Sequence, residues 1–348
     1  MIEQKYFRLS DIFEIKNLKS IDKNKLKQEI GNIPYVSQTK LNNGILSYVC
    51  DHGITKLNFG NCISIGTDTQ VVRYQENNFY SSEKIIGIRN NYLNKYIGYF
   101  IFPILEQILQ KKFSYGHKAS MQRISEIEIK LPSTPDGNPD WEFMESYIRE
   151  QYREVVQERI EELEKKKPDA PTMLRDIEEI QATADFPLGQ VFDVKMSKSI
   201  NNNKLNSTPG NIPYITRTGL NNGILKFVCE QGIETLNPGN VITIGVDTQT
   251  VFYQKQAFYC GNNVLSLSSE NVDQYIGVFI VGILDQIVKK KYSYGYGATL
   301  TRIKNLEIPL PITSDGKPDW EFMSDYIKTQ SQIVFEEELK RLKSKLDE

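Results

Sequence analysis

One stretch of the chain occurs twice, and this duplication decides the fold. Residues 31–45 read Gly31-Asn-Ile-Pro-Tyr-Val-Ser-Gln-Thr-Lys-Leu-Asn-Asn-Gly-Ile45, and residues 210–224 read Gly210-Asn-Ile-Pro-Tyr-Ile-Thr-Arg-Thr-Gly-Leu-Asn-Asn-Gly-Ile224. The same offset of 179 residues aligns Trp141 with Trp320 without a gap. Repeats of about 20–50 residues indicate solenoids, whereas this period has the size of a domain. The sequence therefore predicts two copies of one module that fold in nearly the same way.

The composition is that of a globular protein. The chain has 348 residues, of which 39% are hydrophobic and 25% are charged, and 42 Lys and Arg against 44 Asp and Glu give a formal charge of −2. These values exclude a disordered chain, a collagen-like fibre and a small disulfide scaffold. The length suffices for two domains that each bury a core. The near-neutral charge does not by itself indicate a nucleic-acid partner, although it is compatible with a local basic face.

No segment has the properties of a membrane span or an export signal. The most apolar stretch, residues 96–109, is interrupted by Pro103 and contains Glu106 and Gln107, whereas a span needs about 20 apolar residues. Four cysteines are present without CxxC spacing: Cys50, Cys62, Cys229 and Cys260. We therefore expect a cytoplasmic protein with reduced thiols.

Each module is expected to begin with β-strands and to continue with helices, which makes the fold class α+β. Runs of β-branched and aromatic residues separated by Asn- and Gly-rich turns predict strands over residues 33–36, 45–49, 62–65 and 70–74. An amphipathic helix is predicted over residues 94–111 and again over 273–290, and Pro103 should weaken or kink the first copy. A further strand is predicted over residues 124–131.

A long helix is predicted at the end of each module. Asp140 is placed to cap the first one, which would run from Trp141 to Lys166 and measure about 39 Å at 1.5 Å per residue. The expected apolar stripe consists of Met144, Ile148, Tyr152, Val155, Arg159 and Leu163. In the second copy it consists of Met323, Ile327, Gln330, Val334, Glu338 and Leu342, and is broadened by Ile333, Phe335 and Leu339. Helices that are apolar along one seam pack against a partner, so we expect the two to pair as an antiparallel coiled-coil spacer.

The predicted organisation is module 1 over residues 1–138, a long helix over 139–167, a connection over 168–185, module 2 over 186–317 and a second long helix over 318–348. This plan resembles the specificity (S) subunit of Type I restriction–modification systems and of the related Type IIB systems. The resemblance rests on Gly-Asn-Ile-Pro-Tyr (31–35 and 210–214), on Ser-Tyr-Gly…Arg-Ile (114–124 and 293–303) leading to Ile-x-Leu-Pro, and on the helix that follows each time. The helix entry Asp-Gly-Asn-Pro-Asp-Trp departs from the family's usual pattern.

The resemblance implies a non-catalytic role in DNA recognition. Each module would be a target-recognition domain that reads one half of a bipartite duplex site. The paired helices would fix the separation of the two halves, since one turn of B-DNA is about 34–36 Å. They would also dock adenine-methyltransferase subunits, possibly with an associated endonuclease. No cofactor would bind to this chain, and S-adenosylmethionine would belong to the methyltransferase.

Polar residues of three loop segments have the chemistry to contact DNA, because amides and cations reach base edges and lysines neutralise phosphates. In the first segment three residues are the same in both copies: Thr39, Asn42 and Asn43 correspond to Thr218, Asn221 and Asn222. Two positions differ, since Gln38 corresponds to Arg217 and Lys40 to Gly219. The second, Asp68-Thr-Gln70, is repeated unchanged as Asp247-Thr-Gln249, and a structural turn explains it at least as well as a base contact.

The third segment follows the amphipathic helix and combines paired lysines with aromatic residues. Its candidate contacts are Lys111, Lys112, Ser114, Tyr115, His117, Lys118 and Arg123, with Lys290, Lys291, Ser293, Tyr294, Tyr296 and Arg302 in the other copy. Phosphate anchoring by the lysines and a solvated helix end are equally compatible with this pattern.

Catalytic motifs are missing from the sequence. It contains no methyltransferase motif, no Gly-x-Gly-x-x-Gly loop and no phosphate-binding loop, and Glu128-Ile-Lys130 resembles a nuclease motif only in module 1. His52 and His117 are not repeated, which disfavours a metal site. The remaining alternative is a tandem scaffold or adaptor that binds protein or glycan, which the neutral charge would favour.

Overall fold

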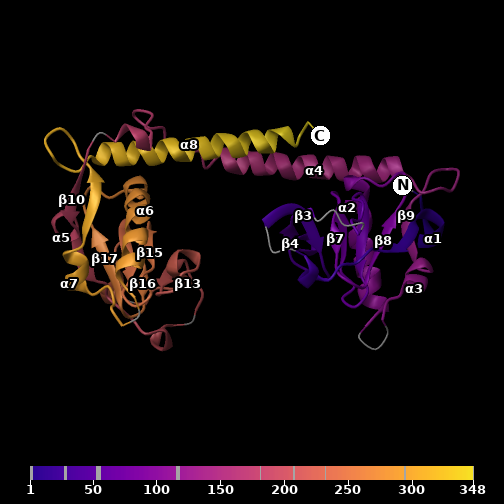
Figure 1. Cartoon of the computed structure of the whole chain (residues 1–348), viewed down its shortest axis with the longest axis horizontal. Helices are drawn as coiled ribbons and strands as arrows, with labels where there is room; N and C mark the ends of the chain where they lie inside the picture. Colours follow the sequence, from indigo (N-terminus) through magenta and orange to yellow (C-terminus); the bar gives the residue numbers. More distant parts are fainter. Residues whose placement is uncertain are drawn as a thin grey trace. The chain divides into compact units, whose positions relative to one another are not determined.

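The computed structural model describes residues 3–26, 30–51, 56–114, 118–180, 182–206, 208–231, 233–293 and 295–347. The chain forms two compact units, unit 1 from Met1 to Arg159 with the residues from Lys345, and unit 2 from Ile160 to Ser344. Each unit contains one copy of the repeated module. Both are mixtures of sheets and helices, so the predicted α+β class is confirmed (Figure 1).

Unit 1 has its elements in the following order: β1 (Gln4–Arg8), α1 (Leu9–Ile12), β2 (Glu14–Asn17), η1 (Lys23–Lys25), β3 (Ile30–Val36), η2 (Asn42–Gly44), β4 (Ile45–Val49), β5 (Cys62–Gly66), β6 (Val72–Gln75), β7 (Tyr80–Ser81), β8 (Ile85–Arg89), α2 (Lys95–Lys112), α3 (Met121–Ser125), β9 (Glu128–Pro132) and α4 (Trp141–Glu164). The four strands predicted in module 1 are therefore confirmed, with shifts of a few residues at their ends.

These strands form three small sheets. A four-stranded antiparallel sheet has the order β2-β8-β5-β6, a three-stranded sheet has the order β4-β3-β7, and β1 pairs with β9. The strand β3 is antiparallel to β4 and parallel to β7. Because α2 is apolar along one face, it packs Ile97, Ile101 and Leu105 against the four-stranded sheet and closes the main core.

Unit 2 repeats this plan after a short connection. Its elements are η3 (Ile177–Glu179), β10 (Thr183–Pro187), α5 (Leu188–Val191), β11 (Asp193–Met196), η4 (Asn202–Lys204), β12 (Ile212–Ile215), η5 (Asn221–Gly223), β13 (Ile224–Val228), η6 (Ile233–Thr235), β14 (Val241–Gly245), β15 (Val251–Gln254), β16 (Tyr259–Cys260), β17 (Val264–Ser268), α6 (Gln274–Lys291), α7 (Leu300–Lys304), β18 (Glu307–Pro311) and α8 (Trp320–Ser344). The register is conserved as well: Cys62 pairs with Gln75 in module 1, and Val241 pairs with Gln254 in module 2.

The helix caps agree with the sequence. Asn94 Oδ1 accepts hydrogen bonds from the backbone N–H groups of Tyr96 and Ile97 at the start of α2, and Asp273 does the same for α6. Asp140 caps α4 through the N–H of Phe143 at 2.9 Å. The helix α2 continues through Pro103 to Lys112, so the proline does not end it.

Two details of the sequence prediction are wrong. Residues 124 and 125 belong to the short helix α3, and the strand β9 starts only at Glu128. On α4 the buried side chains beyond Tyr152 are Val156 and Ile160, whereas Val155 is 63% exposed. On α8 the predicted stripe residue Val334 is likewise 65% exposed, whereas Phe335, Met323 and Leu342 are buried as expected. The difference is confined to the middle of the helices, since the predicted residues Met144, Met323 and Leu342 are buried.

Pairing of the two long helices along their length is a relation between the units and stays a prediction. Within unit 2, the last turn of α4 and the end of α8 form one ion pair, in which Lys343 Nζ lies 3.6 Å from Glu164 Oε1. None of the described helices combines the length and the apolar character required to cross a membrane.

The connection between α4 and module 2 is fixed to α8 by a buried carboxylate. Asp325 is only 1% exposed and accepts hydrogen bonds from the backbone N–H groups of Thr172 (3.0 Å) and Met173 (2.9 Å). Lys328 Nζ lies 3.5 Å from the same side chain. Burial opposes ionisation, but these hydrogen bonds and the lysine together hold the pKa of Asp325 below its ordinary value.

A pair of substitutions in α6 tests how tightly this helix packs. A Cβ atom on Gly277 would lie 2.3 Å from Tyr253 Cδ2, whereas a Cβ atom on Gly282 would meet nothing within 4 Å. Gly277→Ala should therefore lower the free energy of unfolding by about 1–3 kcal/mol through overpacking. Gly282→Ala should raise it by about 0.5–1 kcal/mol, because alanine loses less backbone entropy in a helix. Urea unfolding of the two variants checks the opposite signs.

Candidate nucleic-acid interface

In module 1 the three candidate loop segments meet at Asp68. Its backbone N–H donates to Gln38 Oε1 at 3.0 Å, which joins the β3–β4 loop to the β5–β6 turn. Lys118 Nζ, from the segment that follows α2, lies 3.2 Å from Asp68 Oδ1, and Lys84 Nζ lies 2.9 Å from Oδ2. Hydrogen bonds from Lys84 and then Lys118 hold the pKa of Asp68 below its ordinary value, so this carboxylate is ionised at neutral pH.

The β3–β4 loop has a defined conformation. Asn42 and Asn43 adopt left-handed φ values of 46° and 54°, which asparagine tolerates better than most residues. Asn43 Nδ2 donates to the carbonyl of Tyr74 at 2.8 Å, and Gln75 Nε2 donates to the carbonyl of Asn43 at 3.0 Å. Asn222 and Gln254 make the equivalent bonds in module 2. The second asparagine of each pair therefore tethers its loop to the neighbouring strand.

The unchanged turn has two separate parts. Gln70 and Gln249 have φ values of 54° and 56°, and Gln70 Nε2 donates to the carbonyl of Thr67 at 3.1 Å, so the glutamine shapes the turn. The aspartate at the start of the turn points instead to the neighbouring loops. The structural-turn interpretation therefore applies to Gln70 and Gln249, but not to Asp68 and Asp247.

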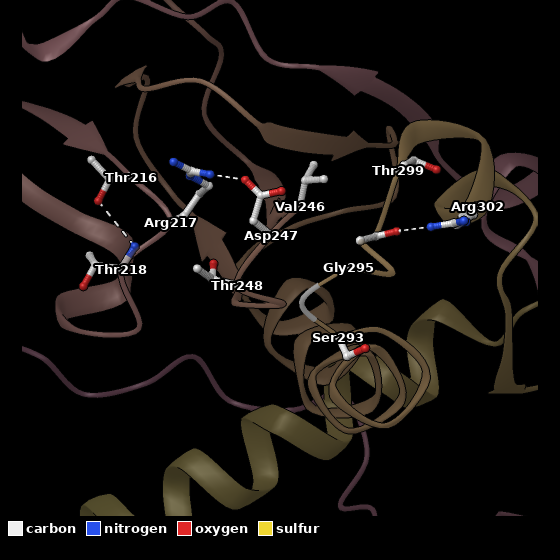
Figure 2. Close-up of a pocket in the computed structure, with 11 residues that line it drawn as sticks. Thr216, Arg217, Thr218, Val246, Asp247, Thr248, Ser293, Gly295, Thr299 and Arg302 are labelled. Carbon is white, nitrogen blue, oxygen red and sulfur yellow. Dashed lines mark hydrogen bonds and ion pairs between the residues drawn. The ribbon is translucent and has the colours of Figure 1, made fainter.

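In module 2 the same segments surround a cavity of about 1050 Å³ (Figure 2). Its lining comes from the β12–β13 loop, the β14–β15 turn, the segment between α6 and α7, and α7 itself: Thr216, Arg217, Thr218, Val246, Asp247, Thr248, Ser293, Gly295, Gly297, Thr299 and Arg302. Arg217 Nη1 forms an ion pair with Asp247 Oδ2 on one wall. Four candidate contact residues therefore share this cavity, namely Arg217, Thr218, Ser293 and Arg302.

An aromatic stack lies beside the cavity. Tyr296 is 50% exposed, and its ring stacks on that of Tyr292 with centroids 5.9 Å apart. The Arg302 guanidinium carbon lies 3.7 Å from the centroid of the Tyr296 ring, and its Nη1 donates to the carbonyl of Gly297 at 2.8 Å. Arg123 makes the same bond to the carbonyl of Lys118 in module 1. Each arginine therefore closes the loop that precedes it.

The paired lysines of module 2 are not among the residues that line this cavity. Lys111 and Lys112 are exposed at the end of α2, and Ser114 follows them. Lys290 lines a different groove of about 670 Å³, together with Ile283, Ile287 and other apolar residues. Lys291 is exposed at the end of α6. Tyr115, His117 and Tyr294 lie outside the described residues.

Several residues at this surface were not predicted from the sequence. Lys84 and Asn263 occupy equivalent positions and both contact the invariant aspartate, the latter at 3.1 Å. Leu41 and Leu220 are each 73% exposed at the tip of the first loop. The sequence could have indicated the leucine, because an apolar residue at a predicted loop is present in both copies of the repeat. Among the residues that the structure describes, no group of three or more His, Cys, Asp or Glu side chains is arranged to hold a metal.

Comparisons with known proteins agree with this architecture. The family model described as "Type I restriction modification DNA specificity domain" matches residues 1–165 and again residues 182–343. The specificity subunit S.BcgI of a type II restriction enzyme from Heyndrickxia coagulans is 29% identical over 343 residues, which cover 96% of each chain. The S subunit of a Type I restriction–modification system from M. genitalium has a TM-score of 0.57 at 15% identity, with 99% of this chain and 92% of that chain covered, and so shares the fold.

Proposed function

Because the chain belongs to the family of Type I restriction modification DNA specificity domains, we propose that each module reads one half of a bipartite duplex site. The chain is a DNA-recognition subunit of a restriction–modification system. The family model matches both modules separately, which supports one reader per half-site. The chain itself would carry out no catalysis.

The main structural support for the proposal is the arrangement of the candidate residues. In both modules the variable loop, the invariant aspartate and the segment after the amphipathic helix meet at one place. The side chains at that place differ between modules, whereas the frame that holds them is the same. Readers of different base sequences would differ in this way, because amides and cations on a fixed frame select bases by their hydrogen-bonding edges.

The long helices would supply the spacing and the docking surface. With 24 residues in α4 and 25 in α8, they measure about 36 and 38 Å, close to the length of one B-DNA turn. Paired along their length, they would separate the readers by about one turn and bind adenine-methyltransferase subunits. S-adenosylmethionine would then be held by the methyltransferase.

Mapping of methylated sites tests this function. The chain is co-purified with its methyltransferase partner, incubated with DNA of random sequence, and the methylated sites are determined by sequencing. We expect two short conserved blocks separated by a fixed spacer. Arg217→Ala should relax the base preference in one block and leave the other unchanged, since that arginine belongs to one module.

The alternative of a tandem scaffold for protein or glycan makes the opposite prediction. It requires binding that tolerates salt and shows no preference among DNA sequences. A wild-type complex that methylates without any sequence motif, or that does not select DNA in a binding assay, would exclude the proposed function.

A further inference from the structure

We infer that Asp68 and Asp247 are positioning residues that hold the base-reading cation of each module, and that this cation comes from a different loop in each copy. The cation is Lys118 in module 1 and Arg217 in module 2, and each would read guanine. The inference rests on the proposed function. It names the side chain by which each module contacts a base.

In module 1 the cation comes from the segment after α2. Lys118 Nζ lies 3.2 Å from Asp68 Oδ1 and Lys84 Nζ 2.9 Å from Oδ2. The residue on the variable loop, Gln38, is neutral, and its amide oxygen accepts from the backbone N–H of Asp68 rather than approaching the carboxylate. Gln38 Nε2 donates to the carbonyl of Glu83 at 3.4 Å. Both ends of the glutamine amide are therefore bonded within the module.

In module 2 the cation comes from the variable loop. Arg217 pairs with Asp247, and the position equivalent to Lys118 is Gly297. A Cβ atom on Gly297 would lie only 4.0 Å from Asp247 Oδ1, so a longer side chain there would compete with Arg217 for the same carboxylate. Asn263 replaces Lys84 and donates to Asp247 Oδ2 at 3.1 Å.

The aspartate keeps a cation partner in both modules. Moving from module 1 to module 2 adds a cation at residue 217 and removes the two that pair with Asp68, since Lys84 becomes Asn263 and Lys118 becomes Gly297, while the aspartate stays. The ion pairs are partly exposed, with side-chain exposures of 52% and 31% for Lys118 and Asp68 and of 40% and 39% for Arg217 and Asp247. Such pairs add little to stability, so folding alone does not account for a retained aspartate whose cation changes loops.

A role of the aspartate in positioning the cation explains why the aspartate is retained in both modules. Arginine and lysine donate to O6 and N7 of guanine in the major groove, and arginine does so with two parallel hydrogen bonds. A carboxylate that binds one edge of the guanidinium restricts the side chain before DNA arrives and leaves other N–H groups for the base. Restriction of a flexible side chain in advance lowers the entropy lost on binding. Because the cation leaves from different loops, the guanine should occupy different places in the two half-sites.

Methylated-site mapping of the assembled complex tests the inference with Asp247→Asn. We expect this variant to lose about 5- to 150-fold of its discrimination for guanine at one position of one half-site, with the other half-site and the thermal unfolding unchanged. Asp315→Asn is the matched control: Asp315 is an exposed carboxylate of the same unit that pairs with Lys317 at 2.8 Å, so the change in charge is identical.

A transplant tests the exchange between loops. Gln38→Arg combined with Lys118→Gly should move the guanine preference of half-site 1 to the place it has in half-site 2, whereas each single substitution should weaken discrimination without moving it. The inference fails if Asp247→Asn discriminates guanine as the wild type does, or if the double variant leaves half-site 1 unchanged. In either case a bipartite motif for the wild type would still support the proposed function, so the two failures are distinguishable.

Discussion

Asp325→Ala should lower the stability of unit 2 by about 2–4 kcal/mol and release the connection from α8. The carboxylate is buried, accepts two backbone hydrogen bonds and faces Lys328. Alanine would leave the N–H groups of Thr172 and Met173 without acceptors, and an unsatisfied buried donor costs about 1–3 kcal/mol. Removal of one partner of a buried ion pair adds to this loss.

Hydrogen exchange and urea unfolding measure the effect. In the variant, the amides of Thr172 and Met173 should exchange much faster, because local opening of the connection becomes easier than global unfolding. The repeat supplies the control: Ser146 is the equivalent residue on α4 and is exposed, so Ser146→Ala should change stability by less than about 0.5 kcal/mol. Unchanged protection of both amides in Asp325→Ala would contradict the prediction.

The pH dependence of the connection has a definite sign. Since the pKa of Asp325 is lowered in the folded protein, its ionised form stabilises the fold. This contribution is complete above the ordinary carboxyl pKa of about 3.9 and is lost as the pH falls through the lowered value. The stability difference between the wild type and Asp325→Asn should therefore shrink only in acid below about pH 4.

The repeat made most of the fold predictable from one sequence. Two copies with the same spacing restrict each other, because a strand, cap or turn has to be compatible with both sequences. Asn94 and Asp273 cap α2 and α6 and Asp140 and Asp319 cap α4 and α8 because side chains that accept hydrogen bonds precede an apolar pattern in both copies. The architecture was thus readable from local chemistry and from duplication.

The exact faces of the long helices and the geometry of the site were not predictable in this way. Val155 and Val156 are equally apolar, and only the packing decides that the second is buried. The meeting of Lys118 with Asp68 depends on how two loops far apart in the sequence approach each other. A comparison of the copies shows that Gln38 and Lys118 are both replaced in module 2. Only the structure shows that the two replacements are related, because both residues contact Asp68.

The paired lysines at the end of α2 should determine how the affinity for DNA depends on salt. Each phosphate neutralised by a lysine adds about 0.9 to the slope of log K against log salt concentration, because bound counterions are released. Lys111→Gln combined with Lys112→Gln should therefore reduce the slope by about 1.8 and weaken binding equally for all sequences. Lysines that contact phosphate position the protein but do not read bases, so the methylated motif should stay the same.

Titration of the assembled complex at several salt concentrations measures this slope, and a charge-matched variant separates local contact from net charge. Lys166→Gln combined with Lys167→Gln removes the same charge from exposed residues after α4 and should leave the slope within error of the wild type, provided that assembly with the methyltransferase is intact. Equal losses in both variants would mean that overall charge, not phosphate contact at the end of α2, governs the affinity. An unchanged slope for the first variant would assign Lys111 and Lys112 to a solvated helix end, where the dipole alone favours a lysine.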